Sequence, residues 1–375
     1  MPFDFFPKEP ADTLYFGSAP ADLSEIGSGR WLPPGNFSAT SVRLPPTAPE
    51  TAPPVSRRFP TRPVSLWWSV ACVVLLLPPL AGQTGPLHSI DGTDGPPTNE
   101  ETFYLELINR ARANPPAEGE RLRTAADPEV QSALAFFRVD TALLAQEFNA
   151  IAAAPPLAFN ARLLNAARLH SRDQFSNQFQ GHTGTNGSTL GARLQAAGYP
   201  FATAGENVFA AGRSVFHGHA GFQIDWGEGP GGMQPGRGHR ATIHNAALRE
   251  VGVGLVLGTN GAVGPQVVTQ NFATQQSATP LLTGVAYADL SGDDFYTPGE
   301  GLGGVTVTVG GVTGFARTTP SGAFTVPLPG NGAYTVRFTG LGFDEGGTVT
   351  VSGGRNVKLD LKATFAAPAL DGPPH

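Results

Sequence analysis

The sequence predicts an α+β layer domain followed by an all-β domain, and three observations support this prediction. Apolar residues recur at helical spacing in several segments between residues 98 and 226. From residue 251 the pattern changes to strict alternation, which is typical of strands. From residue 281 to residue 364 short strand patterns and Gly-rich turns follow one another. This order indicates a compact layered domain of helices and strands, and then a β-sandwich of roughly 85 residues.

The helices of the first domain have recognisable starts and stops. Thr98 to Glu101 matches a capping box, and the apolar stripe after it ends at Asn114-Pro115-Pro116. Asn160 is expected to cap a later helix, one face of which carries Leu163, Ala166, Ala167 and His170. Further helices are predicted at 128–138, 139–151, 188–198 and 214–226.

The strands are predicted from alternation and from the turns between them. Residues 251–258 alternate Val or Leu with smaller residues, and 267–272 reads as the partner strand. Another strand is expected around Glu206. In the second domain the candidate strands are 281–288, 304–309, 312–318, 322–327, 333–339, 346–352 and 356–362.

The segments outside the two domains differ in composition from them. Residues 1–63 are rich in Pro, Ser, Thr and Ala, so we expect them to be disordered or to follow from a start codon placed too early. Residues 64–82 combine a basic flank, an apolar run and a small-residue exit, which is typical of a secretory signal. An uncleaved N-terminal anchor is the alternative, and it would be the chain's only membrane contact. Residues 83–97 are expected to be a linker and 365–375 a disordered tail.

Composition limits the cellular setting and the partners. The expected export signal implies a secreted or extracytoplasmic protein, in the periplasm or at the cell surface. Cys72 is the only cysteine and lies inside the apolar run, so cleavage would leave a chain without thiols or disulfides. The net charge is −6, and no basic stripe is present to neutralise phosphates, which argues against nucleic acid as a partner.

Three short segments carry the candidate chemistry: Gln180 to Gly184, Gly205 to Asn207 and Gly238 to Arg240. Each has glycine beside a His or Glu, so the backbone can turn tightly and present the side chain. Two imidazoles and a carboxylate suit a divalent cation or a general acid/base pair. Taken alone, each histidine could equally be a surface or capping residue.

The order of these segments resembles the CAP superfamily of cysteine-rich secretory, antigen 5 and pathogenesis-related 1 proteins, also described as SCP-like extracellular domains. The resemblance covers about residues 98–275. It rests on the segments 107–112, 166–171, 181–184, 193–199, 205–207, 238–240, 250–254 and 270–272. The resemblance implies an α-β-α sandwich with a central cleft lined by His182, Glu206 and His239, whose two histidines can bind zinc or another divalent cation.

The family pattern has a second acidic residue before the last histidine. Glu228, just after Trp226, is the first candidate for this fourth cleft position and Asp225 the second. A Gly/Pro-rich insertion at 227–236 departs from the family pattern, so the fourth position stays open. Glu206 could act as a general base, but we favour a role as a hydrogen-bond acceptor that orients a histidine. Asn207 is expected to be structural.

The remaining histidines of this domain are not expected to be ligands. His170 lies on an apolar helix face and should be buried. His217 and His219 flank Gly218, where a solvated face is favoured over a metal pair, and His244 is left out as well.

Residues 281–364 resemble the B-type repeat of bacterial surface adhesins and related prealbumin-like modules of immunoglobulin-like shape. The similarity rests on the segments 284–286, 289–300, 303–307, 322–324 and 332–336. Within it, Asp289, Ser291, Asp293 and Glu300 fall at positions 1, 3, 5 and 12 of an EF-hand-like calcium loop. Position 6 holds Asp294 instead of the expected Gly, so a plain acidic hairpin turn is the alternative.

Three functions are compatible with the sequence. The favoured hypothesis is a secreted, non-catalytic protein of the cell envelope that binds a divalent metal and a small apolar or lipid ligand. The second is a metal-assisted hydrolase, protease- or esterase-like, that uses His182, Glu206 and His239 to activate water. The third is an inert envelope component. No nucleophile and no third protein ligand for a metal can be assigned, and this favours binding over catalysis.

Overall fold

The computed structural model describes residues 15–16 and 88–363. The predicted signal or anchor segment and the C-terminal tail beyond residue 363 therefore lie outside the described residues, as does all of the predicted leader except Tyr15–Phe16. Within the described part of the chain, no helix is long and apolar enough to cross a membrane.

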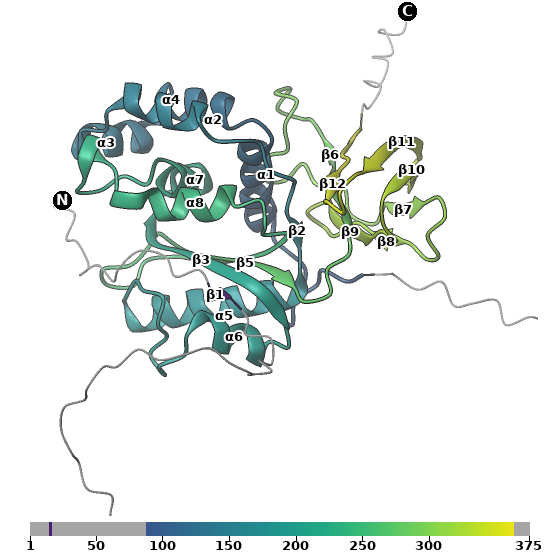
Figure 1. Ribbon diagram of the computed structural model, residues 1–375, viewed down its shortest axis with the longest axis horizontal. Coiled ribbons are helices and arrows are strands. Elements are labelled where there is room, and N and C mark those ends of the chain that lie inside the picture. Colours follow the sequence, from purple (N-terminus) through teal and green to yellow (C-terminus); the bar gives the residue numbers. More distant parts are fainter. Residues whose placement is uncertain (1–14, 17–87, 364–375) are drawn as a thin grey trace, which may run out of the picture. The chain divides into compact units, whose positions relative to one another are not determined.

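The first domain is an α-β-α layer structure, as predicted (Figure 1). Its sheet has the strand order β1-β3-β5-β4-β2, with β5 antiparallel to both of its neighbours and β2 parallel to β4. The strands are β1 (Tyr15–Phe16), β2 (Ala158–Phe159), β3 (Phe201–Gly212), β4 (Glu250–Leu257) and β5 (Gln266–Gln275). The helices are α1 (Asn99–Ala113), α2 (Pro115–Arg123), α3 (Pro128–Phe137), α4 (Thr141–Asn149), α5 (Ala161–Asn177), α6 (Leu190–Ala196), α7 (Val215–Ile224) and α8 (Gly238–His244).

Most of the predicted helices form, and their caps explain where they begin. Thr98 and Glu101 make the reciprocal bonds of a capping box at α1, and Asn160 caps α5. The expected stop after α1 is correct, but a new helix, α2, starts at once with Pro115 in its first turn and Asn114 as its cap. α2 was not predicted, because Pro115 and Pro116 indicated only a stop, whereas proline is also favoured in the first turn of a helix.

The two faces of the sheet are covered by different helices. α1, α7 and α8 lie on one face, and α5 and α6 lie on the other (Figure 1). The alternating glycines of β4 are required by this packing. A Cβ at Gly252 would lie 2.0 Å from the backbone of Leu163, and one at Gly254 would lie 2.2 Å from that of Arg168. α5 therefore packs directly against the strand backbone.

The C-terminal β domain (residues 281–363) consists of two sheets that share one apolar core. One sheet has the order β11-β10-β7-β8, and in the other β6 pairs with β9, β12 and β13. The strands are β6 (Leu281–Ala288), β7 (Thr306–Val309), β8 (Ala316–Arg317), β9 (Ala323–Pro327), β10 (Gly332–Gly340), β11 (Phe343–Val351), β12 (Val357–Lys358) and β13 (Leu361–Ala363). Each candidate strand appears, although 312–318 shortens to two residues and 356–362 divides into two strands.

The C-terminal β domain packs against α1 of the first domain. The Lys358 Nζ atom lies 2.8 Å from Oε2 of the buried Glu106, and the Thr102 hydroxyl donates to the Ser321 hydroxyl at 2.8 Å. The ring of Phe103 contacts that of Phe295, and Ala323 belongs to the core of the first domain. The β domain is thus joined to the first domain by buried contacts as well as by the chain.

The predicted linker is also docked in its described part. The Arg168 guanidinium donates to the carbonyl oxygens of Gly95 (2.9 Å) and Pro96 (2.8 Å), and its ion pair with Glu101 is buried. Ile90 is part of the apolar core. Residues 88–97 therefore dock against α5 and contain a turn closed by backbone hydrogen bonds between Gly92 and Gly95, where the sequence predicted only a spacer.

Candidate functional site

The structure places His182 and Glu206 in direct contact. His182 lies in the loop between α5 and α6, and Glu206 lies on β3. The His182 Nδ1 atom is 3.0 Å from Oε1 of Glu206. The Glu206 side chain is 2% exposed, whereas the His182 side chain is 27% exposed, so the carboxylate lies beneath the imidazole. The pair therefore has a buried carboxylate and a solvent-accessible ring.

Arg193 of α6 fixes this pair in place. Its guanidinium donates to Oε2 of Glu206 at 2.6 Å and to the carbonyl oxygens of His182 (3.0 Å) and Ser188 (2.8 Å). With its amide oriented to satisfy both neighbours, Asn271 of β5 donates to the same Glu206 oxygen at 2.9 Å. Glu206 thus accepts hydrogen bonds from three side chains, and Arg193 ties the His182 loop to β3.

The electrostatics of Glu206 follow from these partners. Burial alone would raise the pKa of this carboxyl, but the hydrogen bond from His182 and the nearby positive charge of Arg193 outweigh it. The pKa therefore lies below its ordinary value, and Glu206 is ionised at neutral pH. Such a carboxylate is suited to orienting His182, and it is a weak base for abstracting a proton from substrate.

His239 has an equivalent arrangement with a different carboxylate. It lies in the first turn of α8, and its Nδ1 is 2.8 Å from Oδ1 of Asp225. The backbone N–H of His239 donates to the other Asp225 oxygen at 3.1 Å. Asp225 is 1% exposed and ends α7 in the left-handed conformation, with φ of 58°. This conformation, rare for a residue other than glycine, directs the carboxylate toward α8.

Asp225, rather than Glu228, is therefore the acidic residue that contacts His239. Glu228 is exposed, and with Phe136, Phe137 and Arg138 it lines a surface hollow of about 490 Å³. The insertion that contains Glu228 is held on α4 instead. The backbone N–H of Asp140, which caps α4, donates to the carbonyl oxygen of Gly231 at 2.9 Å, and just after the insertion Arg237 and Arg240 donate to Glu147. The sequence offered Asp225 only as the second choice, because the capping geometry that aims it cannot be recognised from residue spacing.

Two further residues contact the candidate site, and Asn207 connects its two halves. Asn207 of β3 donates to the carbonyl oxygen of His239 and to the side-chain oxygen of Gln270. His170 is buried, as predicted. Its Nε2 lies 2.8 Å from the carbonyl oxygen of Gly181 and 3.9 Å from Glu206 Oε1. Sequence reasoning treated His170 as a core residue only, and its contact with the His182 loop was not foreseen.

The interpretation of His217 and His219 as a solvated face was wrong. His219 is fully buried and lies 2.9 Å from the Glu118 carboxylate. His217 is 5% exposed, its ring stacks on Phe209, and a tilted contact joins it to Trp226. Burial lowers the pKa of His217 to about 4. His244 also contacts a neighbour of its own, since its Nε2 lies 3.0 Å from the Gln223 side-chain oxygen.

Aromatic rings lie next to the His239 part of the site. The ring of Phe222 is 5.3 Å from that of His239 and 6.0 Å from that of Phe209, which is half-buried. Among the described residues, no group of three or more His, Cys, Asp or Glu side chains is placed to hold a metal ion.

In the acidic loop of the β domain, backbone N–H groups donate hydrogen bonds to the carboxylate oxygens. Asp289 accepts hydrogen bonds from the backbone N–H groups of Gly292, Asp293 and Asp294, and Glu300 accepts from Leu290, Ser291 and Thr297. Ser291 donates to Asp293, and Lys362 pairs with Asp289 and Asp294. Asp294 has φ of 60°, the left-handed conformation that glycine provides at position 6 of an EF-hand loop.

The α-β-α fold and the two histidine–carboxylate pairs, His182 with Glu206 and His239 with Asp225, indicate the class of protein to which the first domain belongs. The family model described as CAP, the cysteine-rich secretory protein family, matches residues 105–272. This part of the chain is a CAP domain.

Among the solved structures that are similar to the chain is an extracellular protein that contains an SCP domain, from Bacillus anthracis, with 23% sequence identity and a TM-score of 0.26. The similarity covers 40% of this chain and 44% of that one, so the chain spans less than half the length of this structure. No curated protein matches the chain.

Proposed function

We propose that this is a secreted CAP-domain protein whose His182 and His239 bind a divalent cation, together with a small apolar or lipid ligand, without catalysis. One observation carries the proposal: each imidazole has a buried carboxylate at its Nδ1 atom. A carboxylate at Nδ1 keeps the proton there, so Nε2 carries the lone pair that a metal needs. Zinc is the cation that two imidazoles suit best, and with only two protein ligands it would exchange readily.

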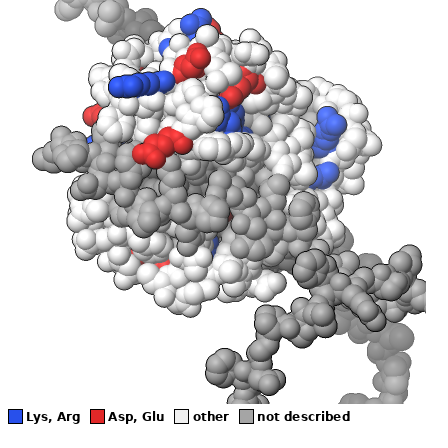
Figure 2. All heavy atoms as spheres, turned by 60° about the vertical axis from the view of Figure 1, so that its left-hand side comes forward, with Lys and Arg blue, Asp and Glu red and all other residues white. Residues whose placement is uncertain are grey.

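The ligand's apolar character is inferred from the rings beside His239. The ring of Phe222 contacts that of His239 and also that of Phe209, and Phe209 retains part of its exposed surface. Charged partners are less suited, since only 14% of the residues are charged. On the face shown in Figure 2, the described acidic and basic side chains are interspersed rather than gathered in a stripe of one sign. Extracellular placement is part of the proposal, supported by the CAP domain and by the described location of the Bacillus protein.

Binding is favoured over hydrolysis because Glu206 and Asp225, the carboxylates that contact the imidazoles among the described residues, already have partners. Glu206 accepts from three side chains, and Asp225 accepts from both the ring and the backbone of His239. A hydrolase would need one of these groups to activate water. The alternative is a role in the cell envelope without a bound metal, which requires no chemistry at the site.

For the acidic loop we propose a second, separate function as a calcium site that stabilises the β domain. The left-handed Asp294 is the observation in its favour, since it gives the loop the turn that Gly would provide. Calcium would have to displace the ammonium of Lys362 from Asp289 and Asp294.

Zinc titration with matched variants tests the proposal for the CAP domain. Calorimetry should detect zinc binding by the wild type, and His182→Ala and His239→Ala should each abolish it. A broad panel of ester and peptide substrates should show no zinc-dependent turnover. Zinc-dependent turnover that disappears in both variants would show that the protein is a hydrolase and not a binding protein. A zinc affinity that is unchanged in both variants would leave an inert envelope component as the remaining hypothesis.

A further inference from the structure

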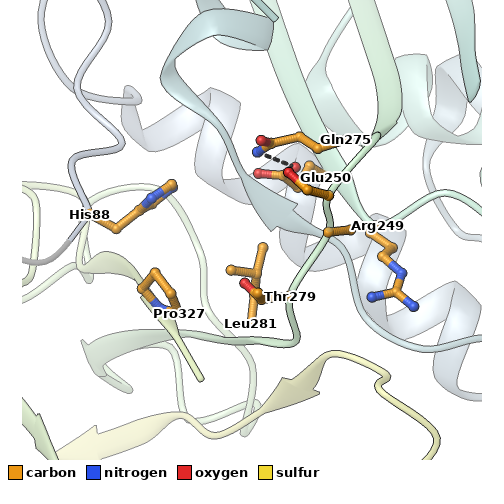
Figure 3. A pocket seen from close by; sticks show the side chains of 9 residues that line it. His88, Arg249, Glu250, Gln275, Thr279, Leu281 and Pro327 are labelled. Atoms are coloured by element: carbon orange, nitrogen blue, oxygen red, sulfur yellow. Dashed lines mark hydrogen bonds between the residues drawn. The ribbon is translucent and has the colours of Figure 1, made fainter. Parts of the chain in front are cut away.

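A small cavity lies where the CAP domain, the docked segment before it and the β domain meet. Its volume is about 100 Å³, room for a few water-sized groups. His88 lies on the docked segment, Glu250 and Gln275 lie on β4 and β5, and Leu281 and Pro327 lie on the β domain. Figure 3 shows the His88 ring and the Glu250 carboxylate pointing toward one another across this space. Small-molecule sites occur preferentially at such domain junctions.

Glu250 gives the cavity its charge. The side chain is 3% exposed and accepts hydrogen bonds from Asn160 (2.8 Å), Tyr199 (2.6 Å) and Gln275 (3.0 Å). Acceptance from three donors, one at so short a distance, is the behaviour of an ionised carboxylate. All three donors are neutral, and no arginine or lysine of the described residues forms an ion pair with Glu250. Its negative charge is therefore buried without an ion-pair partner among the described residues, and such charges are usually paired. The charge of Arg162 reaches this cavity, since it adds to the burial that lowers the pKa of His88.

His88 supplies a second acceptor. Its Nε2 atom is buried and has no hydrogen-bond partner within the described part of the chain. Burial lowers the pKa of His88, so the ring is neutral at neutral pH and can present Nε2 as an acceptor. The Arg249 side chain, which also lines the cavity, points away from His88 and Glu250 in Figure 3. The two groups that face one another across the cavity, His88 Nε2 and the Glu250 carboxylate, are therefore both acceptors, which favours a ligand that donates hydrogen bonds and carries positive charge.

We propose that this junction cavity binds a small primary amine in its ammonium form. The ammonium donates to Nε2 of His88, to the Glu250 carboxylate, which has lone-pair capacity left, and to the Thr279 hydroxyl. The short carbon chain packs on Leu281 and Pro327. Residues 277–279 line the cavity and are exposed, so the ligand enters beside the connection between the two domains. Because both domains contribute, a bound amine also stabilises their docking.

Ethylammonium and ethanolamine hydrochloride are the probes, titrated into the protein at constant ionic strength. The wild type is expected to bind both saturably and to gain thermal stability, and tetramethylammonium and acetate are expected to do neither. Glu250→Gln and His88→Ala should each weaken binding by about tenfold or more, because each removes a partner of a charged group.

A variant at the mouth keeps the proposal testable even if Glu250→Gln fails to fold. Ala278 is exposed and lines the cavity, so Ala278→Trp should block entry of the amine. Ala246 is exposed and is not among the residues that line the cavity, and Ala246→Trp should bind as the wild type does. Absence of saturable binding up to about 100 mM amine would overturn the proposal. Equal binding of tetramethylammonium, or unchanged amine affinity in Ala278→Trp, would overturn it too.

Discussion

The CAP domain and the β domain both contain a group of carboxylates that the sequence marks as possible cation sites, and the structure uses them differently. In the CAP domain, Glu206 and Asp225 contact imidazoles. In the β domain, Asp289 and Glu300 mainly accept backbone N–H groups. The first arrangement positions side chains that can bind something else, and the second folds the loop itself. The partner of a carboxylate therefore says more about its role than its spacing in the sequence does.

The largest expected effect tests whether Glu206 organises the CAP site. Glu206→Ala removes a buried charge and leaves Arg193 without its carboxylate, so the free energy of unfolding should fall by about 3–5 kcal/mol. Denaturant unfolding measures the change. Glu228→Ala, at an exposed position, is the matched control and should stay within about 0.5 kcal/mol of the wild type. If the free energy of unfolding falls as little in Glu206→Ala as in the control, this carboxylate does not stabilise the CAP site.

The buried His217 gives the CAP domain a pH dependence. Its pKa is about 4 in the folded chain and 6.5 in the unfolded one, so the unfolded state takes up the proton first. Its contribution to stability is complete above pH 6.5 and is lost as the pH falls toward 4. The loss amounts to about 3 kcal/mol.

Unfolding free energies measured between pH 7 and 4 test this dependence. His217→Gln does not titrate in that range, so its stability curve should be flatter than that of the wild type. Other buried histidines of the domain, such as His170, have lowered pKa values as well and leave a residual slope of the same sign. Identical slopes in the two proteins would contradict the assignment to His217.

Asp225→Asn separates the two candidates for the fourth position. An asparagine keeps the shape but weakens the hold on His239 Nδ1, so zinc affinity should fall 10- to 100-fold. Glu228→Gln should leave the affinity unchanged, because Glu228 is exposed and lies in the surface hollow with Phe136. Calorimetric titration of both variants distinguishes them, and the reverse ranking would restore Glu228 to the site.

The smallest effect concerns the acidic loop. If calcium competes with the Lys362 ammonium, then Lys362→Met should show a larger calcium-induced rise in Tm than the wild type. Arg337→Met removes an exposed cation from the same domain and should respond as the wild type does. No calcium response in any of the three proteins would make the loop a turn held by backbone hydrogen bonds alone.

More of the architecture than of the site's details could be predicted from the sequence. Helix caps such as Thr98 and Asn160 and the alternation in β4 are local signals, and the structure contains each of them. The docked segment 88–97 could not be foreseen, because its partner Arg168 is distant in sequence. Asp225 received second place because its left-handed conformation depends on tertiary contacts. The burial of His217 and His219 could not be predicted either, because their short Gly-containing helix shows no clear apolar face.

Side-chain ¹⁵N NMR of histidine-labelled protein, before and after addition of zinc, tests the central claim most directly. His182→Asn and His239→Asn identify the two rings in the spectrum. We predict that both rings carry their proton on Nδ1 at neutral pH, and that zinc shifts both Nε2 resonances. A proton on Nε2 in either ring, or Nε2 resonances that zinc leaves unchanged, would contradict the account of carboxylates that prepare two imidazoles for a cation.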